Sequence, residues 1–142
     1  MMSLRHVGIV VSDLEASVRF WCEGVGFVES LRSDEGGEIL DSVLGMSGVD
    51  VTTVKLDAPG GGRIELLRFR SHPGGSWWGG SPATIGLTHV ALTVLNLEHL
   101  LERIVRFGAK PGPVEVAPDG RVRFCYCRGP EGVLLELVEE LV

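Results

Sequence analysis

The chain contains an internal repeat, and this repeat is the feature that most restricts its possible folds. The segment RHVGIVVSDLEASVRF, which starts at Arg5, aligns without gaps with THVALTVLNLEHLLER, which starts at Thr88. In this alignment His6 matches His89. Self-similarity of this kind indicates that one supersecondary unit is used twice.

Each copy begins with a short apolar run that is typical of a β-strand and then reaches a residue that can cap a helix. The capping residues are Ser12 and Asp13 in the first copy and Asn96 in the second. Gly24 and Gly108 stand where the two helices are predicted to end. The apolar residues at helical spacing are Leu14, Val18, Trp21, Cys22 and Val25 in the first copy and Leu97, Leu100, Leu101, Ile104 and Val105 in the second.

Three strand-like stretches follow each predicted helix, so the unit is βαβββ and the fold class is α+β. They read FVESLRS, VDVTTVKL and RIELLRF in the first copy and GPVEV, RVRFCYC and VLLELVEE in the second. The first copy is longer because of EGGEILDSVLGM, which predicts a short helix near Glu38 to Leu44. The predicted organisation is one domain over 1–142, with module one at about 1–71, a Gly/Pro/Ser-rich linker at about 72–84 and module two at about 85–142.

A glutamate stands in the middle of the last strand-like stretch of each copy. Glu65 in RIELLRF points to the same side of the predicted strand as Leu67 and Phe69. A carboxylate among apolar side chains is costly unless something pairs with it. Glu136 in LLELV occupies the equivalent place in the second copy. Two carboxylates in equivalent positions therefore need a partner.

The two histidines and the two glutamates together predict a metal site. Taken alone, a histidine at the start of a strand is most often structural, and a glutamate in a strand is most often a surface partner of an arginine. The recurrence of His6, His89, Glu65 and Glu136 at equivalent positions favours a common site between the two modules. Two imidazoles and two carboxylates suit one divalent ion such as Ni, Co, Zn, Mn or Fe(II).

Charge and composition exclude several other classes of protein. With 13 basic and 19 acidic residues the net charge is −6, and no basic patch suggests binding to nucleic acid or to an anionic membrane. The longest apolar runs, such as VGIVV, are far shorter than the ~20 residues that a membrane span needs. The three cysteines have no CxxC spacing, which indicates a reducing compartment. A cytoplasmic location is therefore expected.

The chain resembles the vicinal oxygen chelate superfamily, which includes glyoxalase I, methylmalonyl-CoA epimerase, extradiol dioxygenases and the fosfomycin and bleomycin resistance proteins. The resemblance is carried by HVGIVVSDLEASVRFWCEGVGF, IELL, GLTHVALTV and RGPEGVLLELVE. It implies paired βαβββ modules that form a curved, half-open mixed sheet around one divalent metal ion. The implied metal ligands are His6, Glu65, His89 and Glu136. It also implies a homodimer and a small-molecule substrate with adjacent oxygens.

The activity that this resemblance implies is that of a metal-dependent lyase or isomerase. Such an enzyme removes a proton α to a carbonyl and stabilises the resulting enolate, and Glu136 is the expected base. Three positions depart from known members. Val10 and Phe69 replace the Arg and Asn that bacterial-type glyoxalase I enzymes use for glutathione, and Met46 replaces a second catalytic glutamate of methylmalonyl-CoA epimerases. The substrate, including any role for glutathione or CoA, stays open.

Two alternative functions remain at this point. Tyr126 lies ten residues before Glu136, as in extradiol dioxygenases that use Fe(II), although it is also explained as a strand residue that packs beside Phe124. A metal-free protein that binds a small molecule or an antibiotic would use Trp77 and Trp78 to line its groove. The candidate pocket residues are thus Tyr126, Trp77, Trp78 and Met46. A site between the modules can form within one chain or across a swapped dimer.

Overall fold

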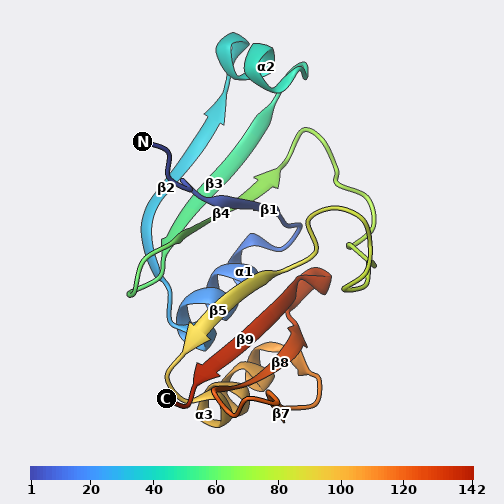
Figure 1. Ribbon diagram of the computed structural model, residues 1–142. Coiled ribbons are helices and arrows are strands. Elements are labelled where there is room, and N and C mark those ends of the chain that lie inside the picture. Colours follow the sequence, from blue (N-terminus) through green and yellow to red (C-terminus); the bar gives the residue numbers. More distant parts are fainter. The chain divides into compact units, whose positions relative to one another are not determined.

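The computed structural model describes residues 1–142, and the chain divides into two compact units, Met1–Ser76 and Trp77–Val142 (Figure 1). The boundary between them falls inside the predicted linker. Each unit carries one mixed β-sheet and the helices that pack on it. The predicted α+β class with two βαβββ modules is confirmed. No helix in the chain is both long enough and apolar enough to cross a membrane.

The first unit has a four-stranded sheet in which the strand carrying Glu65 is an interior strand. The order across the sheet is β1-β4-β3-β2, with β1 parallel to β4 and the other pairs antiparallel. The predicted helix after β2 is present with the predicted bounds. The elements are β1 (Val7–Val10), α1 (Leu14–Arg19), β2 (Val28–Gly36), α2 (Glu38–Leu44), β3 (Asp50–Asp57) and β4 (Arg63–Phe69).

The first helix changes its geometry and ends later than predicted. After α1 the chain continues as a π-helix over Phe20–Val25, in which Phe20 and Trp21 are both almost completely buried. The helix ends at Gly26, whose φ of 111° is readily adopted by glycine and whose N–H donates to the carbonyl of Trp21. The predicted stop at Gly24 is wrong, because the wider turns carry the helix past it.

The second unit has a five-stranded sheet with the same order of its main strands. The order is β5-β9-β8-β6, and β7 also pairs with β8. Gly108 ends the helical segment at a φ of 87°, as predicted. The elements are β5 (Val90–Val94), α3 (Leu97–Ile104), a 3-10 turn (Val105–Phe107), β6 (Lys110–Pro111), β7 (Glu115–Val116), β8 (Val122–Arg128), a 3-10 turn (Pro130–Gly132) and β9 (Leu134–Glu140).

The strand predicted for GPVEV is shorter than expected: only its last two residues, Glu115–Val116, form a strand, β7, and a separate short strand, β6, precedes this stretch. β6 and β7 each pair with β8, but they are separated by Gly112–Val114. Pro111 and Pro113 have no N–H group to donate, so this stretch cannot form a continuous ladder of hydrogen bonds. Gly112 keeps one contact with β8 by donating its N–H to the carbonyl of Tyr126 at 2.8 Å.

Both predicted caps are present at the helix starts. The Asp13 carboxylate accepts the N–H of Ala16 at 3.0 Å, and the Asn96 side chain accepts that of His99 at 3.1 Å. These caps satisfy amide groups that have no partner inside their own helix.

The core of each unit lies on the face of the sheet that its helix covers. On β4 the buried residues Ile64 and Leu66 flank Glu65, and on β9 the buried residues Leu135 and Leu137 flank Glu136. Because side chains alternate along a strand, each glutamate points to the face opposite to the core.

Glu139 on β9 generates a prediction about acid stability. Its carboxylate accepts the Nε–H of Arg123 at 2.6 Å and the N–H of Leu97 at 3.1 Å. The Arg123 bond and then the Leu97 bond hold the pKa of Glu139 below its ordinary value of 4.5. A carboxyl group with a lowered pKa stabilises the fold above its unfolded-state pKa, and this stabilisation is lost as the pH falls through the folded-state pKa.

We therefore predict that Glu139→Gln lowers the Tm at pH 7 and that the difference from the wild type shrinks towards pH 3. Thermal unfolding between pH 3 and pH 7 measures it. Glu140→Gln, on the exposed neighbouring position of the same strand, serves as the control and should leave the Tm nearly unchanged. A Tm difference for Glu139→Gln that is as large at pH 3 as at pH 7 would contradict the prediction.

Candidate functional site

The first unit brings His6 and Glu65 together, as the sequence predicts. His6 Nε2 lies 3.6 Å from Glu65 Oε1. The parallel pairing of β1 with β4 puts Gly8 beside Glu65, and His6, two residues earlier, lies on the same face. Glu65 is 14% exposed and His6 is 28% exposed. The pair is thus partly shielded from water but still accessible.

The second unit brings His89 and Glu136 together in the same way. His89 Nε2 lies 3.3 Å from Glu136 Oε2, and Ala91 pairs with Glu136 as Gly8 pairs with Glu65. Thr88 Oγ1 lies 2.7 Å from His89 Nδ1. The imidazole is therefore anchored at one nitrogen, while the other faces the carboxylate.

In each unit a third residue, on the strand next to that of the glutamate, contacts the His–Glu pair. Lys55 on β3 pairs with Glu65, and its Nζ lies 3.9 Å from Glu65 Oε2. Tyr126 on β8 pairs with Glu136, and its hydroxyl lies 3.4 Å from His89 Nε2. We call His6, Lys55 and Glu65 the first cluster, and His89, Tyr126 and Glu136 the second cluster.

Lys55 is the residue that the sequence reasoning missed, although a signal for it existed. Tyr126 is picked out by its position ten residues before Glu136, and Lys55 stands ten residues before Glu65. In both units this spacing spans an antiparallel pair of strands that brings the two residues side by side. The repeat therefore extends to a third position, at which the residue type differs.

The two histidines differ in how their second nitrogen is held. His6 Nδ1 is buried and has no hydrogen-bond partner in the protein, whereas His89 Nδ1 contacts Thr88. Neither unit by itself gathers three or more His, Cys, Asp or Glu side chains. Each unit thus contributes one imidazole and one carboxylate.

The linker tryptophans are held against the turn that precedes β9. The Arg128 guanidinium lies 5.3 Å from the centre of the Trp78 ring and donates to the carbonyls of Gly132 and Gly80, at 3.1 and 2.5 Å. A side chain at Gly132 would come within 2.6 Å of the Trp78 carbonyl oxygen, so only glycine fits there. Trp77 is 66% exposed. The role of both tryptophans in a substrate pocket stays a prediction.

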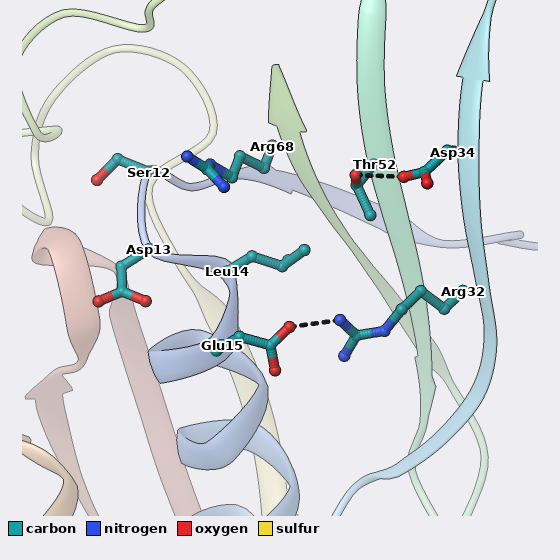
Figure 2. A pocket seen from close by; sticks show the side chains of 8 residues that line it. All are labelled: Ser12, Asp13, Leu14, Glu15, Arg32, Asp34, Thr52 and Arg68. Carbon is teal, nitrogen blue, oxygen red and sulfur yellow. Dashed lines mark hydrogen bonds and ion pairs between the residues drawn. The ribbon is translucent and has the colours of Figure 1, made fainter. Parts of the chain in front are cut away.

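A surface pocket of about 560 Å³ in the first unit lies away from the first cluster (Figure 2). Thr52 and Arg68 pair with each other across β3 and β4 and point to the face opposite to Glu65. Figure 2 shows Arg32 reaching from β2 to Glu15 at the first turn of α1. The pocket is lined by Ser12, Asp13, Leu14, Glu15, Arg32, Asp34, Thr52 and Arg68. Its charged groups hold the helix start to the sheet.

Met46, the remaining predicted pocket residue, follows α2 and is partly buried. Its N–H donates to the carbonyl of Asp41 at 3.0 Å, and the Asp41 carboxylate accepts the N–H groups of Gly48 and Val49. These bonds to Val49 and Gly48 hold the pKa of Asp41 below its usual value. The contacts of Met46 and Asp41 thus fix the turn between α2 and β3, and a pocket role for Met46 stays a prediction.

Comparison with known proteins identifies the family. The model of the Glyoxalase/Bleomycin resistance protein/Dioxygenase superfamily matches residues 3–137, so the chain belongs to this superfamily. A crystal structure of a glyoxalase family protein from Bacillus cereus is 30% identical, with a TM-score of 0.91 over 100% of this chain and 96% of that chain.

Other relatives are more distant. The uncharacterized protein YwkD of Bacillus subtilis (strain 168) is 29% identical over 99% of this chain and 98% of its own length. A variant of the fosfomycin resistance protein FosX from Listeria monocytogenes, complexed with Mn(II) and 1S,2S-dihydroxypropylphosphonic acid, is 17% identical. The structural alignment covers 96% of this chain and 89% of the FosX chain, with a TM-score of 0.65. FosX shares the fold with this protein.

The contacts of Arg128 predict that this residue fixes Trp78. Replacing it by methionine removes two hydrogen bonds and a cation–π contact, so Arg128→Met should cost about 1–3 kcal/mol of unfolding free energy and make Trp78 more accessible. Denaturant unfolding and iodide quenching of tryptophan fluorescence measure the two effects. Arg121→Met, at an exposed position, is the control. Unchanged quenching in Arg128→Met would show that the contact does not hold the ring.

Proposed function

We propose that the protein is a divalent-metal-dependent lyase or isomerase that removes a proton α to a carbonyl. The observation that carries this proposal is the presence of two equivalent His–Glu pairs, one in each unit, each already assembled with an imidazole nitrogen 3.3–3.6 Å from a carboxylate oxygen. In this proposal residues 1–142 act as one domain, or as a swapped homodimer, in which the two clusters complete one site.

The residues present fit a divalent metal ion. Two donors bound at neighbouring positions of one ion, each about 2.1 Å from it, stand roughly 3 Å apart, close to the separation within each pair. Neutral imidazole and carboxylate are suitable ligands for first-row divalent ions. The buried Nδ1 of His6 also lacks a partner, and such an unsatisfied polar atom is uncommon away from functional sites. The proposed ligands are His6, Glu65, His89 and Glu136.

The chemistry divides between the ion and the side chains. When bound, a divalent ion supplies a Lewis acid that lowers the cost of negative charge on a substrate oxygen. Glu136 is the proposed base. Its carboxylate takes the proton from the carbon next to the carbonyl, and the electron pair of that C–H bond moves into the enolate. If Glu136 returns the proton to a neighbouring atom the product is an isomer, whereas epimerisation requires that the opposite face of the same carbon receives a proton from water or another acid.

Tyr126 favours one competing function. Its hydroxyl lies 3.4 Å from His89 Nε2, and its ring centre lies 5.1 Å from that of the imidazole. An extradiol-type dioxygenase with Fe(II) would use a tyrosine in such a place. Glu65 argues for the lyase or isomerase, because a fourth protein ligand leaves fewer positions for a second substrate. A metal-free binding protein would have no need for the two half-buried glutamates.

The experiment that tests the proposal is exchange of an α-proton with deuterated solvent. Purified protein loaded separately with Ni, Co, Zn, Mn or Fe(II) is incubated in D₂O with 2-oxo, 2-hydroxycarbonyl and acyl-CoA compounds, and exchange is followed by NMR. We predict metal-dependent exchange that falls by about 10²–10⁴-fold in Glu136→Gln, in line with the usual contribution of a general base. Glu140→Gln is the control on the same strand.

Three results of this experiment have distinct meanings. Loss of exchange in Glu136→Gln with metal retained supports Glu136 as the base. Unchanged exchange in that variant removes Glu136 from the role. Ring cleavage of a catechol with consumption of O₂, in place of exchange, would replace the lyase or isomerase by the dioxygenase.

The Thr88 hydroxyl generates a second prediction. In the metal-free protein His89 Nε2 faces the Glu136 carboxylate, so we expect the proton on Nε2 and the Thr88 hydroxyl donating to Nδ1. An imidazole that ligates through Nε2 must instead carry its proton on Nδ1, where the Thr88 oxygen can accept it. Zinc titration followed by ¹⁵N NMR should therefore show the His89 tautomer change.

Variants at Thr88 test whether its hydroxyl matters. Thr88→Val keeps the shape and removes the hydroxyl, so it should weaken zinc binding by about tenfold, while Thr88→Ser should bind nearly as the wild type does. Equal zinc affinity in Thr88→Val and the wild type would remove Thr88 from this role.

A further inference from the structure

The proposed function gives no role to Lys55 of the first cluster or to Tyr126 of the second, and Lys55 is the basic residue of these two. It lies on the same face as Glu65, next to it across β3 and β4, and its side chain is 24% exposed. Glu65 is its carboxylate partner, at 3.9 Å between Nζ and Oε2. A lysine that replaces the tyrosine of the second cluster makes the two halves of the site chemically different.

The surroundings of Lys55 leave space on its face of the sheet. Across the sheet, Lys55 pairs with Leu31 on β2 on one side and with Glu65 on β4 on the other. Glu65 in turn pairs with Gly8 on β1. Gly8 has no side chain, and a Cβ at this position would contact only Leu67 Cδ1, at 3.5 Å. The next acidic residue along β3 is Asp57, whose carboxylate accepts from Nε and Nη2 of Arg63 at 2.6 and 3.1 Å. Asp57 is therefore not free to neutralise Lys55.

The charges of the proposed site need one more negative group. A divalent ion is neutralised by the carboxylates of Glu65 and Glu136, and Lys55 then adds one positive charge. If the Glu65 carboxylate binds the ion, the Lys55 ammonium loses its counter-ion. A half-buried ammonium without a counter-ion is unfavourable. One singly charged anion balances the site, whereas a doubly charged phosphonate would leave it negative.

We propose that Lys55 binds the carboxylate of the substrate, so that the substrates are 2-oxo or 2-hydroxy acids rather than neutral carbonyl compounds. This inference rests on the proposed function, because it assumes that Glu65 serves the metal ion. Lys55 is a specificity-determining residue in it: it selects a negatively charged substrate through charge, and it takes no part in the transfer of the proton.

The test is binding of three small probes to Mn(II)-loaded protein, measured by isothermal titration calorimetry. Pyruvate and pyruvamide present the same adjacent oxygens and differ by one charge, and acetylphosphonate carries a phosphonate instead. In Lys55→Met the Kd of pyruvate should rise at least about tenfold, while that of pyruvamide should change less than about twofold. Lys55→Arg should keep most of the affinity for pyruvate. Lys110→Met removes the other lysine and is the matched control.

Metal affinity gives an independent readout. Because Lys55 places a positive charge beside a proposed ligand, Lys55→Met should bind Mn(II) as tightly as the wild type or up to about tenfold more tightly. A loss of Mn(II) binding would show that Lys55 supports the cluster structurally, and it would overturn the proposal. An equal loss of affinity for pyruvate and pyruvamide would also overturn it.

The remaining outcomes separate this inference from the proposed function. Binding of pyruvate that depends on Lys55, without any α-proton exchange, supports the inference and contradicts the lyase or isomerase. Exchange of pyruvate, at a concentration below its wild-type Kd, that is equally fast in Lys55→Met and the wild type overturns the inference and leaves the proposed lyase or isomerase intact. Tighter binding of acetylphosphonate than of pyruvate, lost in Lys55→Met, overturns the carboxylate assignment in favour of a phosphonate.

Discussion

Two half-buried carboxylates on interior strands are the constraint on which the candidate site depends. Glu65 and Glu136 stand between core residues along their strands, yet they point away from the core, each towards an imidazole. An interior strand is held on both sides by its neighbours, so the glutamate cannot move far. Removing a carboxylate from water has to be offset by a cation or by hydrogen bonds. The neighbouring histidine, lysine and tyrosine supply part of that compensation.

The two clusters are equivalent in backbone and different in chemistry. In both, the residue ten positions before the glutamate lies beside it across an antiparallel pair of strands, but it is Lys55 in one unit and Tyr126 in the other. The histidines differ too, since Thr88 anchors His89 and nothing in the protein anchors Nδ1 of His6. In the function that we propose, the equivalent histidines and glutamates are the metal ligands of both halves. The third position then differs: Lys55 would recognise the charge of the substrate, and Tyr126 places an aromatic hydroxyl in the second cluster.

Much of the fold and both His–Glu pairs were predictable because the repeat compares the sequence with itself. A pattern that occurs twice identifies the histidine and glutamate positions without any structure. Lys55 was missed because a self-alignment detects identical residues, and Lys55 and Tyr126 are not alike. The helix end at Gly26 was missed because π-helical turns do not follow the α-helical spacing used for the prediction. The strand predicted for GPVEV is reduced to β7 because of Pro111 and Pro113, whose missing N–H groups matter only once the partner strand is known.

We propose that one ion is bound by both clusters, and anomalous diffraction from crystals grown with Mn(II) or Zn(II) is the direct test. We expect one anomalous peak per chain, with His6, Glu65, His89 and Glu136 all within bonding distance, whether the two clusters come from one chain or from two chains of a swapped dimer. Two peaks per chain, each on one cluster alone, or a peak at neither cluster would contradict it.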